Sequence, residues 1–174
     1  SARNHGITRS LDNRFSAGKP WEYDIEESGF NFRLDEIRSA LGLSQMKRLD
    51  KFNDLRKKAS EYYTSQLTDV KGIITPKISK NNENSFHLYI IRITKDFPLT
   101  RDVLFKKLLN NGIRTSVHYK PLNQFTLFKK MAKSYDKLEI SNMLYDEILS
   151  LPMYPTIRKS DQNYVIKSIK DGII

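Results

Sequence analysis

The sequence contains no cysteine and only three histidines among its 174 residues. The absence of cysteine excludes disulfide bonds and thiolate metal sites, and it agrees with a reducing cytoplasm, which is the compartment we expect. The histidines, His5, His87 and His118, lack the spacing of metal ligands, so we expect no metal site. No apolar stretch is long enough to span a membrane, and we expect no membrane association.

The sequence also lacks the short motifs of several common catalytic sites. It has no G-x-S-x-G nucleophile elbow, no G-x-x-x-x-G-K-[ST] phosphate loop and no G-x-G-x-x-G dinucleotide fingerprint. Nothing in the pattern joins a serine, a histidine and a carboxylate into a triad. The residues alone therefore identify no complete catalytic set.

Positive charge is the strongest feature of the composition, since 30 lysines and arginines face 20 acidic residues, for a net charge of +10. Such a balance is compatible with a basic nucleic-acid-binding module, and we keep this as an alternative function. The lysines, however, are spread over helix faces and occur in pairs beside apolar positions, such as Lys57-Lys58. Zinc-finger and aromatic RNA-binding signatures are absent, so we expect a solvated basic surface and no nucleic-acid partner.

The spacing of apolar residues predicts the elements of the first two thirds of the chain. Apolar residues three and four apart over residues 34–67 predict helix, with a break near 45–49. Short strands are predicted within 70–76, 86–93 and 113–117, where β-branched and aromatic residues gather. Between the last two strands, Thr100 is expected to cap a helix that ends at Asn111-Gly112.

The last third of the chain is predicted to be mainly helical. A short helix is expected after Pro121, and a second over residues 137–149. Residues 151–155 should be extended, because each proline disfavours helix at the residue before it. Ser160 is the expected N-cap of the last helix. The fold class predicted is α+β, with a small mixed or antiparallel sheet packed with helices.

One segment carries the clearest functional pattern, a glycine-flanked turn that leads directly into a helix. It places Asn31 and Arg33 just before that helix, whose pattern starts at Leu34. Helix N-termini carry unpaired N–H groups and a positive partial charge, and they are suited to anionic ligands. The segment therefore predicts a ligand-binding turn, although an asparagine in a turn can also simply bond its own backbone.

Four blocks along the chain, in the same order, resemble vitamin-B6-dependent nucleotide-sugar aminotransferases of the DegT/StrS type. The blocks are residues 3–6 (RNHG), 29–42 (GFNFRL through ALG), 112–122 (GIRTSVHYKPL) and 149–155 (LSLPMYP). The resemblance implies the small C-terminal lobe of a fold-type-I pyridoxal phosphate (PLP) transferase. Residues 1–33 would then be the connecting segment from a large domain missing here, and 34–174 the small C-terminal domain.

The resemblance also implies a reaction. Such enzymes hold PLP on a lysine and move an amino group, usually from glutamate, to a keto group of a nucleotide-linked sugar, for instance in polysaccharide biosynthesis. They work as homodimers. That lysine would lie upstream of this chain, so we expect no catalytic residue here and no activity of the chain alone. Some relatives replace the lysine by histidine and act as sugar dehydratases, an alternative that this chain cannot exclude.

The same resemblance assigns expected roles to individual residues. Asn31 matches the asparagine that reaches the cofactor phosphate of the other subunit. Arg33, His118 and Tyr119 match positions near the substrate, although Arg33 could instead brace the helix start and a lone histidine at a strand end is often structural. Asn123 stands where many relatives have a second histidine, which leaves a proton-transfer role at that position in doubt.

Overall fold

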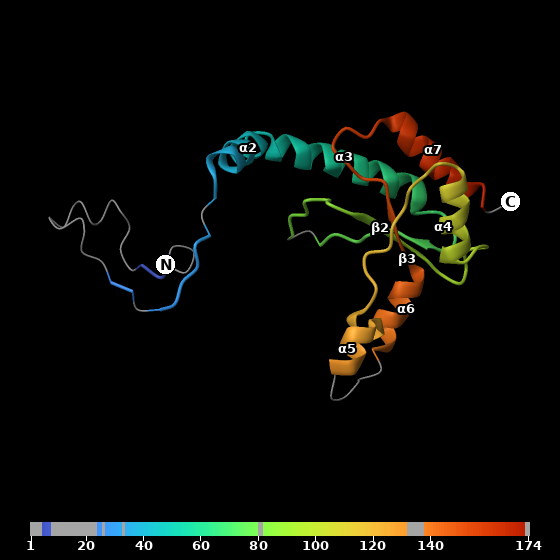
Figure 1. Cartoon of the computed structure of the whole chain (residues 1–174). Helices are drawn as coiled ribbons and strands as arrows, with labels where there is room; N and C mark the ends of the chain where they lie inside the picture. Colours follow the sequence, from blue (N-terminus) through green and yellow to red (C-terminus); the bar gives the residue numbers. More distant parts are fainter. Residues whose placement is uncertain are drawn as a thin grey trace. The chain divides into compact units, whose positions relative to one another are not determined.

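The computed structural model describes residues 5–7, 24–25, 27–32, 34–79, 82–131 and 138–172. The chain divides into two compact units, Ser1–Leu49 and Asp50–Ile174, and each unit is described here by itself. Figure 1 shows the elements of both units along the chain. None of the helices in the described ranges is long and apolar enough to cross a membrane.

The first unit contains a glycine-dependent close approach between two chain segments. The amide of His5 donates to the carbonyl of Phe30 at 2.9 Å, and Ile7 bridges Ile25 in antiparallel fashion. Gly29 lies against Gly6 so closely that a Cβ at Gly29 would stand 2.0 Å from the Gly6 nitrogen. The turn before Asn31 therefore requires glycine, which explains the glycine-flanked pattern in the sequence.

Helix α2 (Glu36–Met46) follows this turn. Asp35 is its N-cap, and the Asp35 carboxylate accepts from the amide of Arg38 at 2.8 Å. Within Glu36–Met46 no residue is buried, and Ile37 is 83% exposed. The predicted break in the helical pattern is confirmed, because α2 ends at Met46 and α3 (Leu49–Leu67) begins at Leu49.

The second unit is built on a three-stranded antiparallel sheet. Its order is β1 (Ile73–Ile74), β2 (Tyr89–Ile93) and β3 (Ile148–Leu151), so the strands of the sheet come from distant parts of the chain. In the register of the central pair, Ile90 lies opposite Ser150. This confirms the predicted small sheet and fixes it as antiparallel.

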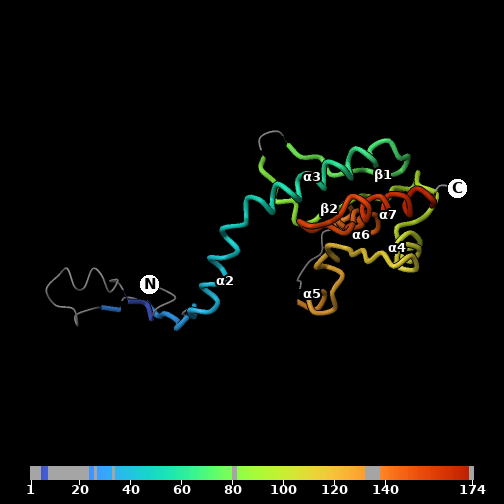
Figure 2. Tube along the Cα trace, turned by 90° about the horizontal axis from the view of Figure 1, so that it is seen from above, coloured from blue at the N-terminus to red at the C-terminus, as the bar shows by residue number. Residues whose placement is uncertain are grey.

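The core of the second unit lies between one face of this sheet and three helices. Alternate residues of β2 are buried, and they pack against α3, α4 (Arg101–Asn110) and α7 (Lys159–Lys170). Helices α3 and α7 lie side by side, as Figures 1 and 2 show, and Gln162 of α7 donates to the carbonyl of Ala59 of α3 at 2.9 Å. The side chains buried completely include Tyr63, Leu67, Ile91, Leu104, Leu108, Leu149 and Ile169.

The remaining helices belong to a part of the second unit that Figure 1 draws on the side of the sheet away from α3 and α7. It contains the 3₁₀ helix η1 (Leu122–Gln124), α5 (Thr126–Met131) and α6 (Glu139–Glu147). Arg101, which is buried at the start of α4, donates to the carbonyls of Tyr145 and Ile148 at 2.9 and 3.1 Å. This arginine therefore ties the end of α6 and the first residue of β3 to the core.

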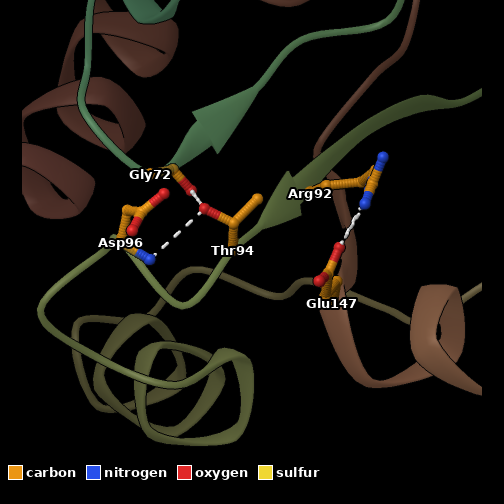
Figure 3. A network of polar contacts seen from close by, with 5 residues as sticks. All are labelled: Gly72, Arg92, Thr94, Asp96 and Glu147. Atoms are coloured by element: carbon orange, nitrogen blue, oxygen red, sulfur yellow. Dashed lines mark hydrogen bonds and ion pairs between the residues drawn. The ribbon is translucent and has the colours of Figure 1, made fainter.

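Polar contacts hold the C-terminal end of β2 (Figure 3). Arg92 forms an ion pair with Glu147 at 2.6 Å, and the hydroxyl of Thr94 donates to the carbonyl of Gly72 at 3.2 Å. Gly72 has a φ of +82°, and a Cβ there would stand 2.1 Å from the amide nitrogen of Phe97. Only glycine fits this tight turn between α3 and β1.

The prediction of a strand over residues 113–117 was wrong. Within this segment only Ser116 pairs as in a sheet, through a single bridge to Ser150, and the third strand of the sheet is β3 instead. The helix predicted over residues 137–149 stops at Glu147, and its last two predicted residues belong to β3. The apolar pattern marks segments that favour strand, but long-range pairing decides which of them occupies the edge beside β2.

The predicted start of the last helix was also slightly wrong. Thr100 caps α4 as expected, since its hydroxyl accepts from the amide of Val103 at 3.4 Å. In contrast, α7 begins at Lys159, its N-cap is Arg158, and Ser160 lies inside the first turn, where its hydroxyl bonds Asp161. Asp161 also forms an ion pair with Arg158 at 3.0 Å across the helix start, and the N-cap makes no side-chain hydrogen bond to the helix.

Candidate functional site

The segment that leads to His118 starts from the glycine end of α4. Gly112 has a φ of +74°, and the amides of Gly112 and Ile113 donate to Leu109 and Leu108, which closes the helix. The chain then runs along β3, where Ser116 and Ser150 exchange backbone hydrogen bonds of 3.2 and 2.8 Å. This pairing brings the next residues to the edge of the sheet.

His118 is half-buried and held by a side chain of β3. Its Nδ1 lies 2.8 Å from the Oγ of Ser150, a residue that is only 4% exposed. The ring of Tyr119 packs edge-on against the imidazole with centroids 4.7 Å apart, and Tyr119 is itself 72% exposed. The two residues predicted near the substrate therefore form one cluster, with the histidine anchored and the tyrosine open to solvent.

The residues after Tyr119 carry further polar groups. Lys120 lies over the ring of Phe125 at 5.2 Å, and Gln124 donates to the side chain of Asn142 at 2.9 Å. The side-chain oxygen of Asn123 is buried and has no hydrogen-bond partner in the part of the chain described here. Burying such an atom without a partner costs free energy.

Asn31 lies in the first unit, on the turn before α2. Its side chain is exposed, and among the described residues it makes no hydrogen bond, including none to its own backbone. The rings of Phe30 and Phe32 stack on each other at 4.8 Å. Among the described residues the amide of Asn31 therefore has no acceptor, and it lies on a turn shaped by glycine. Arg33 lies outside the described residues, and its predicted role stays a prediction.

The predicted site residues therefore fall in different units, with Asn31 in the first and His118 and Tyr119 in the second. Two hollows of the second unit, of about 1110 and about 440 Å³, are lined by neither His118 nor Tyr119. The described residues contain no group of three or more histidine and carboxylate side chains that could hold a metal ion.

Sequence reasoning did not find Ser150 as a partner of His118. The two residues are 32 positions apart, and they meet only because β3 joins the sheet. Ser150 does lie in the 149–155 block that carried the resemblance, but that block gave no indication of a contact with a histidine. The contact depends on the strand pairing that the sequence did not predict.

Comparison with known proteins places these residues in context. The chain is 30% identical over 96% of its length to the spore coat polysaccharide biosynthesis protein SpsC of Bacillus subtilis. It is 31% identical over 94% of its length to UDP-4-amino-4,6-dideoxy-N-acetyl-beta-L-altrosamine transaminase of Campylobacter jejuni. The chain covers 44% and 41% of these two proteins, so it spans less than half the length of the curated relatives it matches.

The fold is similar to that of solved sugar aminotransferases. The structure of Spr1654 from Streptococcus pneumoniae in its PMP form matches 98% of this chain and 43% of its own, with 25% identity and a TM-score of 0.80. Spr1654 has also been solved in a PLP form. The sequence profile of the DegT/DnrJ/EryC1/StrS aminotransferase family matches residues 1–170. This chain therefore belongs to the DegT/DnrJ/EryC1/StrS aminotransferase family.

Proposed function

We propose that this chain is part of a PLP-dependent aminotransferase that moves an amino group from an amino-acid donor, glutamate, to the keto group of a nucleotide-linked sugar. The observation that carries the proposal is the family match over residues 1–170, together with a relative whose printed name is a UDP-sugar transaminase. A place in polysaccharide biosynthesis is supported by the similarity to SpsC. The family match favours this reaction over a nucleic-acid-binding module.

In this proposal Asn31 holds the cofactor. A primary amide is a neutral donor with a short reach, and the Asn31 amide has no partner among the described residues, so it fits a phosphate oxygen of PLP. When bound, PLP supplies the electron sink for amino transfer, and the protein supplies binding and orientation. We assign no catalytic residue within these 174 residues, and the lysine that would carry the cofactor belongs to the remainder of the enzyme.

His118 and Tyr119 bind the substrate in this proposal, with Arg33 as a third contact. Support comes from the anchored imidazole beside an exposed phenol, which together offer hydrogen-bonding groups. An open cluster of this kind is consistent with a site that another part of the enzyme completes. Residues 1–33 would connect this part to a large domain, and 34–174 would form the small one.

We further propose that the full enzyme is a cytoplasmic homodimer in which Asn31 reaches the cofactor of the partner subunit. The exposed apolar side chains around α2 support an interface on the first unit, since large apolar groups gathered on one element usually become covered by a partner. They include Phe30, Phe32, Leu34, Ile37, Leu41, Leu43 and Met46. The lack of cysteine agrees with a reducing compartment.

The reaction is tested with the full-length enzyme, glutamate and a keto nucleotide-sugar. We expect 2-oxoglutarate and an amino sugar to form in equal amounts. Mass spectrometry measures both products. The 174-residue chain alone should form neither, because it carries no cofactor lysine in this assignment. Loss of water from the sugar without consumption of glutamate would favour the dehydratase alternative and would contradict amino transfer.

The role of Asn31 is tested by Asn31→Ala in the full-length enzyme. Loss of one hydrogen bond to a charged phosphate should weaken cofactor binding by about 1.5–3 kcal/mol, measured by absorbance titration of the cofactor-free enzyme. Asn110→Ala, which removes an exposed amide at the end of α4, is the matched control and should leave cofactor affinity unchanged. An unchanged affinity in Asn31→Ala would rule out the phosphate contact.

A further inference from the structure

The contact between His118 and Ser150 has a defined geometry because strand pairing fixes the serine. Ser150 lies in β3 opposite Ile90 of the central strand, and its backbone also bridges Ser116 on the other side. Its hydroxyl, buried with the rest of the residue, lies 2.8 Å from Nδ1 of His118. Ser150 is thus paired with a residue of a neighbouring segment on each side. Among the described residues its hydroxyl has a single hydrogen-bond partner, His118.

The direction of this hydrogen bond follows from the donors and acceptors available. A hydroxyl has one hydrogen to donate and two lone pairs, whereas a neutral imidazole has one donor nitrogen and one acceptor nitrogen. Within the described ranges Ser150 Oγ has no hydrogen-bond partner other than His118 Nδ1. If Nδ1–H donated to Oγ, the buried hydroxyl hydrogen would have no acceptor, and an unsatisfied buried donor is costly. The hydroxyl should therefore donate to Nδ1.

The tautomer of an imidazole is set by the hydrogen bond at its other nitrogen. With Nδ1 accepting from Ser150, the neutral ring carries its hydrogen on Nε2. We infer that Ser150 is a positioning residue that holds His118 in the Nε2–H tautomer, so that His118 presents a hydrogen-bond donor to an oxygen of the nucleotide-sugar. A proton at Nδ1 would reverse the Ser150 bond and leave the hydroxyl hydrogen without an acceptor among the described residues. The substrate part of the inference depends on the proposed function, whereas the tautomer does not.

The tautomer is tested directly by ¹⁵N NMR of the 174-residue chain with labelled histidine, at a pH where the imidazole is neutral. His118→Gln identifies the signals of His118 among the three histidines. In the unsubstituted chain we expect a proton on Nε2 and none on Nδ1, with the Nδ1 shift of a hydrogen-bonded acceptor. A proton on Nδ1 would overturn the inference, whatever the activity of the enzyme.

Two variants and one control separate the role of the hydroxyl from general damage to the fold. Ser150→Ala should move the Nδ1 signal toward that of a nitrogen with no hydrogen bond and should populate the second tautomer, while Ser150→Thr should restore both properties. Ser116→Ala, on the opposite residue of the same bridge, removes an exposed hydroxyl and should leave His118 unchanged. An Nδ1 signal unaffected by Ser150→Ala would overturn the role of Ser150.

The consequence for substrate binding is measured in the full-length enzyme. Ser150→Ala should raise KM for the nucleotide-sugar about 2- to 12-fold, the range for one net hydrogen bond, with a smaller change in kcat and recovery in Ser150→Thr. The expected NMR result together with an unchanged KM would overturn the substrate role of His118 and leave the tautomer intact. Failure of the aminotransferase assignment is seen separately, as absence of amino transfer in the unsubstituted enzyme.

Discussion

Leu108→Ala is expected to destabilise the second unit by about 3–5 kcal/mol, enough to unfold a large fraction of a domain of ordinary stability. Leu108 is completely buried in the core, where α4 packs against the sheet and α7. Shortening its isobutyl side chain to a methyl group loses apolar burial and leaves a cavity that the surrounding helices can close only in part. Urea unfolding followed by far-UV circular dichroism measures the change.

The neighbouring leucine is a matched control. Leu109 is 51% exposed on the same helix, so Leu109→Ala makes the same chemical change with little loss of burial. It should cost less than about 1 kcal/mol. Equal destabilisation of the two variants would mean that Leu108 is not buried in the core. It would contradict the packing of α4 on the sheet described above.

Alkaline pH is expected to destabilise the second unit steeply, beginning near pH 10. Burial raises the pKa of Tyr89 to about 12 against an ordinary value of 10.0, and the hydrogen bond with Thr64 lowers it only in part. Burial also raises the pKa of Tyr63, whose ring stacks on Tyr89 at 5.1 Å. Both phenols are therefore held neutral in the folded protein at a pH where they ionise in the unfolded chain.

The sign of the pH effect follows from these shifts. Since the folded pKa lies above the unfolded one, the unfolded state loses its proton first, and stability falls as pH rises from about 10 toward 12. Tyr89 alone should contribute about 2 kcal/mol of loss by pH 12, and Tyr63 should add to it.

Urea midpoints measured between pH 8 and 12 test the alkaline prediction. Tyr89→Phe, which cannot ionise, should reduce the slope above pH 10, although the variant starts from lower stability because it loses its bond to Thr64. A flat dependence up to pH 12 in the unsubstituted protein would contradict the burial of both phenols.

Local patterns were enough to predict most helices. The break between α2 and α3, the Thr100 cap and the glycine end of α4 depend on residues within one or two turns of each other, and all three were confirmed. Caps and breaks are short-range because they satisfy backbone groups of the same helix end. The start of α7 differed, since the helix begins at Lys159 with Arg158 as its N-cap and no side-chain hydrogen bond at that cap.

The sheet was harder to predict, for a physical reason. Residues 113–117 and 148–151 both favour strand, and only one segment can pair with the free edge of β2. Pairing depends on packing over the whole face and on anchors such as Arg101, which bonds the carbonyl of Ile148 from a distant helix. No window of the sequence contains this information.

For the candidate site, too, some features depend on local sequence and others on long-range pairing. The amino-acid sequence by itself determined the family, the α+β class and several helix ends, and it marked Asn31, His118 and Tyr119 as candidates, because each of these depends on residue order over short stretches. Only the tertiary structure decided which segment became the third strand, and with it that a serine 32 residues away holds the His118 ring. A hydrogen bond across a sheet exists only after the strands have paired, since pairing is what brings the two side chains within reach.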